Sequence, residues 1–154
     1  MKSAYYAAVV TNTYRIAMDS YSAGNYIYDP RWLRELESVS HRPYHTGFYF
    51  DNPTENANTT DNPGYLRENA YLATVEEYDE QSGLARLRQK NKFAVGASIE
   101  LLTPGKTGIP LIAGAMFDEN KQPIDAVPHP QMLFYMRMPF AVKPGDILRA
   151  GISE

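Results

Sequence analysis

The spacing of apolar residues near the start of the chain predicts an amphipathic helix from Ser3 to Tyr21. Ser3 is suited to cap its first turn, because a serine hydroxyl accepts a hydrogen bond from a free backbone N–H. Gly24-Asn25 marks the end, since glycine readily adopts the left-handed backbone that closes many helices. The apolar face predicted by this spacing consists of Tyr6, Val10, Tyr14, Ala17, Met18 and Tyr21.

A second, shorter helix is predicted to begin at Asp29-Pro30, where an N-cap residue precedes a proline suited to the first helical position. Each helix is too short to be stable alone, so both are expected to pack on another part of the protein. The predicted apolar stripe of this helix is Trp32, Leu33, Leu36 and Val39, and the predicted outward residues are Arg34, Glu35 and Glu37.

Residues 51–65 form a polar stretch with almost no side chain that a core could bury. A composition of this kind, with proline and glycine, is typical of an exposed linker or a long loop. We therefore expect three parts: a helical segment with a junction over residues 1–50, a linker over 51–65, and a folded domain over 66–154.

From Tyr71 onward the apolar positions alternate with a period of two, which predicts strands. Asp79 to Gly83 is a turn between two such runs, so residues 71–89 are expected to form a hairpin. Further strands are predicted at 98–102, 111–117, 132–136 and 147–149, with turns at 104–105, 118–123 and 143–146. About six short strands at this interval favour a small closed barrel. The predicted fold class is α+β, with two N-terminal helices followed by a small antiparallel β-barrel.

Composition narrows the function classes. The 154 residues carry a net charge of −3, so no overall basic field attracts nucleic acid or anionic lipid. The chain has no cysteine, which excludes disulfides, thiolate metal sites and a cysteine nucleophile within it. No stretch approaches the run of about 20 apolar residues that a membrane span requires, and no signal peptide is recognisable. We expect a cytoplasmic protein without membrane contact.

The densest group of chemically capable side chains runs from Ser40 to Phe50 and includes His41 and His45. Two histidines four residues apart could bind a metal from one face of a helix. However, Pro43 forces Arg42 toward an extended backbone, which disfavours that geometry. The alternative is a packed connection between helices and barrel, with Gly47 supplying a permissive backbone.

His129 lies between two prolines in Pro128-His129-Pro130, where a rigid backbone would hold its imidazole in place. Such a histidine could act as a base or simply belong to a structural loop. The chain contains no nucleophile-elbow motif that would supply its partner. We therefore expect no catalytic residue, no metal site and no cofactor in this chain.

Four cations fall at every second position, at Arg86, Arg88, Lys90 and Lys92. On a strand they would project from one face, with Ala85 and Leu87 toward the core. A row of this kind could follow a phosphate backbone. Alternatively it is a solvated outer face that Glu76 or Glu77 on the paired strand partly neutralises.

Five groups of motif residues follow one another along the chain: Tyr5-Tyr6 with Tyr14-Arg15, Ser40-His41-Arg42-Pro43-Tyr44 with Gly47, Asn91-Lys92-Phe93, Pro128-His129-Pro130, and Pro144-Gly145-Asp146. In the order and spacing of these motifs, the chain as a whole resembles the C-terminal part of the collagenase-like peptidase family U32. The resemblance implies that these motif residues are structural, and that a catalytic domain with the family's cysteines precedes this part as its partner. It also implies that the barrel resembles the second domain of translation elongation factors.

The family was named for proteolysis, while several members are implicated in hydroxylating a base of transfer or ribosomal RNA, with an iron–sulfur centre and prephenate. Three hypotheses follow. The first is a non-catalytic module that presents RNA or protein substrate to the catalytic domain through Arg86, Arg88, Lys90 and Lys92. The second is a residual metal-dependent peptidase using His41, His45 or His129. The third is a structural piece that covers the catalytic domain, or a second copy of the chain, through Tyr6, Val10, Trp32 and Leu36.

Overall fold

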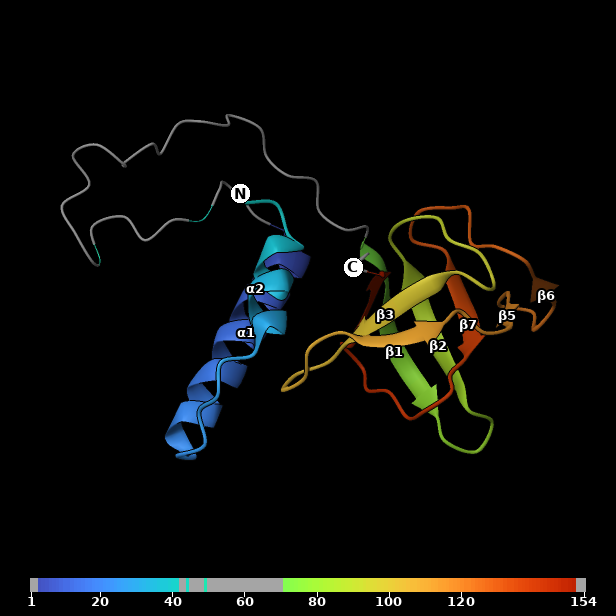
Figure 1. Cartoon of the computed structure of the whole chain (residues 1–154). Coiled ribbons are helices and arrows are strands. Elements are labelled where there is room, and N and C mark those ends of the chain that lie inside the picture. Colours follow the sequence, from blue (N-terminus) through green and yellow to red (C-terminus); the bar gives the residue numbers. More distant parts are fainter. Residues whose placement is uncertain (1–2, 42–43, 45–48, 50–70, 152–154) are drawn as a thin grey trace.

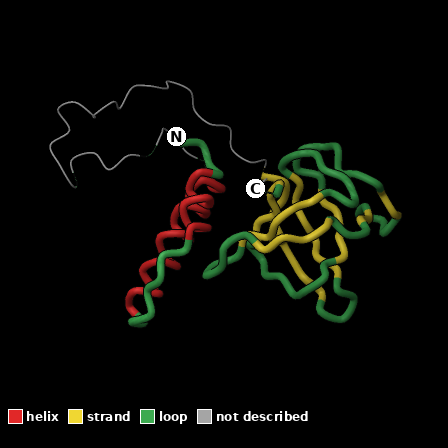
Figure 2. The backbone as a smooth tube through the Cα atoms, in the orientation of Figure 1, coloured by secondary structure: helices red, strands yellow, loops and turns green. Residues whose placement is uncertain are grey.

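The computed structural model describes residues 3–41, 44, 49 and 71–151. Two helices, α1 (Ala4–Ser22) and α2 (Pro30–Glu37), lie side by side, and a curled antiparallel sheet stands next to them (Figure 1). Figure 2 shows that the helices form one part of the fold and the strands another. The predicted α+β class is therefore confirmed.

Helix α1 begins and ends where the sequence predicts. The Ser3 hydroxyl accepts a hydrogen bond of 3.1 Å from the backbone N–H of Tyr6. Gly24, just beyond the end, has a φ of 73°, a backbone conformation that side chains with a Cβ rarely adopt.

The predicted buried face of α1 is wrong, because the face in contact with the sheet is displaced by one residue. The buried residues are Tyr5, Val9 and Thr13. By contrast, Tyr14, Met18 and Tyr21 are exposed. Apolar residues occur on both sides of α1, so helical periodicity alone does not decide which side meets the sheet.

Helix α2 also has its predicted start, since the Asp29 carboxylate accepts a hydrogen bond of 2.9 Å from the N–H of Arg31. Its predicted orientation is only partly right. Trp32 is buried, but Leu33 is 41% exposed, and Glu35, expected to face outward, is only 4% exposed. The buried carboxylate of Glu35 is neutralised by Arg149 of the sheet.

In the part of the chain that the structure describes, the sheet has eight strands in the order β4-β3-β8-β1-β2-β7-β5-β6, all paired antiparallel. The predicted hairpin is confirmed as β1 and β2, with a β-bulge between Val75 and Glu77. The strands are β1 (Tyr71–Asp79), β2 (Leu84–Gln89), β3 (Ser98–Leu102), β4 (Ile109–Ile112), β5 (Met116–Phe117), β6 (Pro123–Ile124), β7 (Leu133–Arg137) and β8 (Ile147–Ala150).

The strand predicted at 111–117 is divided into β4 and β5, and β6 lies where a turn was predicted. Gly114 lies between β4 and β5, where a Cβ would come within 2.5 Å of the backbone oxygen of Arg137. The segment pairs with β3 at its start and with β7 at its end. The sheet therefore curls into a half-barrel whose two end regions are connected by this one stretch of chain. The prediction of a closed barrel is wrong, because the end strands of the described sheet, β4 and β6, do not pair with each other.

The main core fills the curl of the sheet and is formed by residues of all its long strands. Leu87, Phe134 and Met136 are completely buried there. Phe93, which follows β2, packs edge-to-face on Phe134 with ring centroids 5.8 Å apart. A second, smaller cluster joins the helices to the sheet and consists of Tyr5, Val9, Val39, Leu102 and Ile147.

The predicted linker at 51–65 and both of its domain boundaries lie outside the described residues. Neither α1 nor α2 is long and apolar enough to cross a membrane.

Candidate functional site

The two arginines and the two lysines of the basic row (Arg86, Arg88, Lys90 and Lys92) lie in different kinds of backbone. Arg86 and Arg88 project from β2 on the face opposite the buried Ala85 and Leu87, as predicted. Strand β2 ends at Gln89, however, so Lys90 and Lys92 lie in the loop that follows it. The predicted end of the hairpin at Gln89 is confirmed, so only Arg86 and Arg88 of the four cations project from a strand face.

The two arginines of β2 are neutralised by the neighbouring strand. Arg86 forms an ion pair with Glu77 at 3.2 Å, and Arg88 forms one with Glu76 at 2.5 Å. The pairing of β1 with β2 brings these side chains together across the two strands. Their positive charge is therefore offset locally.

The two lysines form no ion pair with the residues that the structure describes. The Lys90 ammonium lies 6.0 Å from the ring centroid of Tyr71, and its Nζ is 3.4 Å from Oε1 of Gln131. A cation above an aromatic face is weakly attracted by the ring. This end of the barrel therefore carries positive charge beside a ring.

Backbone hydrogen bonds hold the motif around Lys92 against the motif around His129. Gln89 donates its N–H to Met132 and accepts one from Gln131, at 2.9 and 3.1 Å. Val127 donates to the carbonyl of Phe93 at 3.0 Å. Two motifs that are far apart in the sequence thus share one end of the barrel. We call Lys90, Lys92, His129, Gln131 and the ring of Tyr71 the lysine end.

Other motif residues that the structure describes stabilise the backbone of loops and turns. Asn91 donates its side-chain amide to the carbonyl of Tyr71 at 2.7 Å. Gly145 has a φ of 92°, and the buried Asp146 accepts a hydrogen bond of 2.9 Å from the N–H of Lys143. The predicted turn at 143–146 is therefore confirmed, and the carboxylate of Asp146 closes it.

The junction after α2 is described only in part, because Arg42, Pro43, His45 and Gly47 lie outside the described residues. His41 is buried, and its ring stacks on Tyr44 with centroids 4.3 Å apart. The Tyr44 hydroxyl donates a hydrogen bond of 3.1 Å to the carbonyl of Leu36. In the described part of the chain, no three His, Cys, Asp or Glu residues are grouped as metal ligands.

The strongest electrostatic feature lies between α2 and the sheet, where the guanidinium of Arg149 is completely buried. It forms ion pairs of 2.7 Å with Glu35 of α2 and with Glu100 of β3. Burial alone would lower the pKa of Arg149, but the hydrogen bond and charge of Glu35 outweigh it and raise that pKa. Arg149 therefore stays charged and holds the helix to the sheet.

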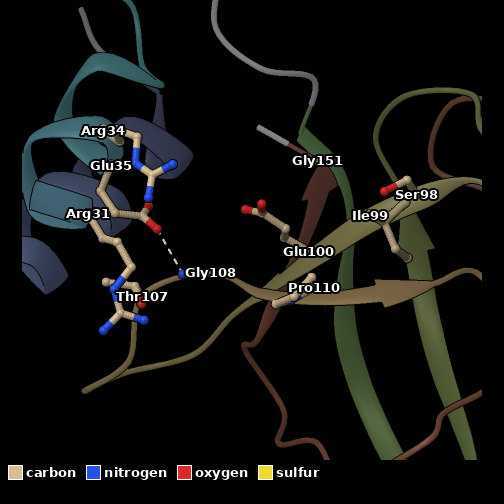
Figure 3. A pocket seen from close by; sticks show the side chains of 10 residues that line it. All are labelled: Arg31, Arg34, Glu35, Ser98, Ile99, Glu100, Thr107, Gly108, Pro110 and Gly151. Atoms are coloured by element: carbon tan, nitrogen blue, oxygen red, sulfur yellow. Dashed lines mark hydrogen bonds between the residues drawn. The ribbon is translucent and has the colours of Figure 1, made fainter. Parts of the chain in front are cut away.

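A cleft of about 560 Å³ opens over this buried group (Figure 3). The backbone N–H of Gly108 donates a hydrogen bond of 2.8 Å to Glu35 at its wall. Arg31 and Arg34 also line the cleft, but the Arg31 guanidinium is bound to Asp29 at 2.6 Å. Those hydrogen bonds from Arg31 lower the pKa of Asp29. The cleft thus has both signs of charge: Arg31 is paired with Asp29, and Glu35 and Glu100 are paired with Arg149 beneath it.

Neither Arg149 nor Glu35 was expected from the sequence to be a site residue. A signal was present in both cases: Arg149 interrupts the apolar run of β8, and Glu35 lies between Trp32 and Val39 in a short helix. A charged residue within an apolar stripe indicates a buried ion pair only if its partner is known.

Two family models match the chain. The model described as the peptidase family U32 C-terminal domain matches residues 67–149, and the model described as peptidase family U32 matches residues 1–59. The first of these matches covers the sheet, and the second covers both helices.

Curated relatives are similar over most of the chain. It is 26% identical to tRNA hydroxylation protein P1 of Bacillus subtilis (strain 168) over 153 residues, which are 98% of this chain and 36% of that protein. It is 36% identical to tRNA hydroxylation protein P of Escherichia coli (strain K12) over 104 residues, 67% of this chain and 22% of that one. The chain therefore spans only about a third or less of these relatives' length.

A solved structure supports the fold. The C-terminal domain of a Geobacillus thermoleovorans protein described as a U32 peptidase superposes with a TM-score of 0.50 at 23% identity. The superposition covers 53% of this chain and 92% of that domain.

Proposed function

This chain belongs to peptidase family U32, and we propose that within the family it is a non-catalytic module that binds the RNA substrate of an RNA-hydroxylating protein. Its partners in this proposal are the RNA and the catalytic domain. The barrel would serve the binding role in the manner of the second domain of translation elongation factors.

The observation that carries the proposal is the lysine end. Lys90 and Lys92 have no ion-pair partner among the described residues, whereas Glu77 and Glu76 offset the charges of Arg86 and Arg88. Exposed lysines can contact phosphates, and the nearby Tyr71 and His129 rings are of the kind on which unpaired bases stack. We therefore assign most of the contact to the lysines and a smaller share to the arginines.

The names of the relatives favour RNA over protein as the substrate. Both the Bacillus subtilis and the Escherichia coli relatives are named tRNA hydroxylation proteins. The chain corresponds to a minor share of each, so the hydroxylation itself is expected to depend on the remainder of such proteins. We therefore assign RNA binding, and not the hydroxylation reaction, to the lysine end.

A salt series with a tRNA transcript tests the proposal. Wild-type protein should bind more weakly as salt rises. In the double variant Lys90→Glu/Lys92→Glu, the negative slope of log K, the association constant, against log salt should become shallower by about 2. The matched control is Lys106→Glu/Lys143→Glu, which makes the same change of charge at exposed lysines outside the lysine end. The control should retain wild-type affinity and slope. Equal binding by the two double variants would refute the proposed contact.

A further inference from the structure

The helices and their connection expose a group of large uncharged side chains, which we call the tyrosine face. Tyr14, Met18 and Tyr21 follow one another at helical spacing along α1 and are 58%, 59% and 75% exposed. The face continues through the connection between α1 and α2 and onto α2. Its other members are Tyr26, Ile27, Tyr28 and Leu33, which are 41–80% exposed.

The aromatic part of this face has a defined geometry. Tyr21 contacts Tyr26 edge-on with ring centroids 6.3 Å apart, and Tyr28 stands perpendicular to Trp32 at 6.1 Å. Tyr26 also packs against Trp32 at 5.8 Å. Rings that support one another in this way form a pre-organised surface, which loses little conformational entropy when a partner binds.

The sheet does not reach the tyrosine face. The buried positions of α1 end at Thr13, and the second half of the helix extends beyond the sheet (Figure 1). A soluble monomer rarely exposes an apolar patch of this extent, so such a patch is typical of a protein–protein contact.

Charge argues against nucleic acid as the occupant. Two of the three cations beside the face in sequence are already paired, Arg15 with Asp19 at 2.8 Å and Arg31 with Asp29 at 2.6 Å, and the third, Arg34, lines the cleft next to the sheet. No residue of the tyrosine face is charged. An RNA backbone would find no net attraction there, whereas an apolar protein surface would match.

The match to the family models indicates which protein covers the tyrosine face. The model described as peptidase family U32 includes both helices, and a separate model includes the sheet. The Bacillus subtilis relative is nearly three times as long as the part that this chain matches. We propose that the tyrosine face packs against the remaining part of a U32 domain, the part of the relatives that this chain does not match. This inference rests on the family and on the helices, not on RNA binding.

The surface differs from the one expected from the sequence. That expectation used Tyr6, Val10, Trp32 and Leu36, but Trp32 is buried and the other three are only partly exposed. The sheet contacts the displaced face of α1, so the second half of the predicted stripe, with Tyr14, Met18 and Tyr21, is left open to a partner.

Thiol labelling tests the inference, because the chain has no cysteine and one introduced thiol reports alone. Met18→Cys places the thiol on the tyrosine face, and Ile112→Cys on β4 places a matched thiol at an equally exposed apolar position of the sheet. In this chain both thiols should react at similar rates. In the intact Bacillus subtilis relative, a cysteine aligned with residue 18 should react at least tenfold more slowly, while one aligned with residue 112 should be unchanged.

Mass spectrometry of the labelled peptides gives each rate separately from any other thiol. Similar rates at the two aligned positions of the intact relative would overturn the inference. So would protection of the Met18→Cys thiol in this chain alone that grows with protein concentration, because the occupant would then be a second copy. Neither measurement involves RNA, so its failure is distinct from failure of the proposed substrate binding.

Discussion

Glu35 of α2 and Arg149 of β8 are 114 residues apart in the chain, yet their side chains form a buried ion pair of 2.7 Å. Removing two charges from water costs several kcal/mol, which is recovered only where further hydrogen bonds complete the geometry. Glu100 and the N–H of Gly108 supply such bonds. The pair therefore defines how α2 is seated on the sheet.

Loss of this ion pair should destabilise the protein strongly. Glu35→Ala leaves Arg149 buried with one carboxylate fewer, so the free energy of unfolding should fall by about 3–5 kcal/mol. Urea denaturation measures it, with Glu37→Ala as the control. Glu37 is exposed on the same helix, and its change should stay within about 0.5 kcal/mol. Equal losses in the two variants would contradict the role of the pair.

Gly108 is expected to tolerate no side chain. A Cβ at this position would collide with Nη2 of Arg149 and with Oε2 of Glu100. Gly108→Ala should therefore lower the free energy of unfolding by about 1–3 kcal/mol through overpacking. Gly151→Ala is the control in the same cleft, because its Cβ would come no closer than 3.4 Å to Ser98. Comparable thermal denaturation midpoints for the two variants would disprove the expected collision.

Asn12 is expected to fasten α1 to the loop between β3 and β4. Its side chain accepts a hydrogen bond of 2.8 Å from the N–H of Gly105 and donates one of 2.9 Å to the carbonyl of Lys106. Asn12→Ala should cost about 1–2 kcal/mol and speed hydrogen exchange at the Gly105 amide. Thr11→Ala, an exposed neighbour on the helix, should leave that amide unchanged. Unaltered exchange in Asn12→Ala would show that the contact does not hold the loop.

Alkaline pH should lower the free energy of unfolding, partly because the Tyr5 phenol ionises. Burial raises the pKa of this phenol, although Arg149 opposes the shift, so the folded protein retains a proton that the unfolded chain loses above pH 10.0. The stability linked to Tyr5 is complete below that pH and is lost as pH rises through the folded pKa, by up to about 1.4 kcal/mol per pH unit. Urea denaturation between pH 9 and 11 should show a shallower decline for Tyr5→Phe than for wild type. Parallel declines would rule out this linkage.

Local features of the fold could be predicted from the sequence because neighbouring residues decide them. Ser3 and Asp29 cap their helices, and Gly145 occupies the turn expected of it. The hairpin of β1 and β2 follows for the same reason, since alternation and an intervening turn are contained in a short stretch of chain. The sequence also placed Arg86 and Arg88 opposite the core correctly.

The candidate site could be predicted only in part. Lys90 and Lys92 were identified by their spacing, but a strand of four cations requires β2 to continue past Gln89, where the chain instead turns toward Met132. His129 lies at the same end of the sheet as the lysines because of backbone hydrogen bonds between distant segments. A short stretch of sequence does not show which distant segments pair.

The sequence by itself determined the types and ends of the helices, most of the strands, and the motifs that connect the chain to its family. Only the tertiary structure decided which faces are buried. Helical periodicity on α1 permits two adjacent faces, and the sheet selects the one with Tyr5 and Val9. Glu35 faces inward for a related reason: burying a carboxylate is unfavourable unless a cation compensates it, and that cation, Arg149, comes from the far end of the chain.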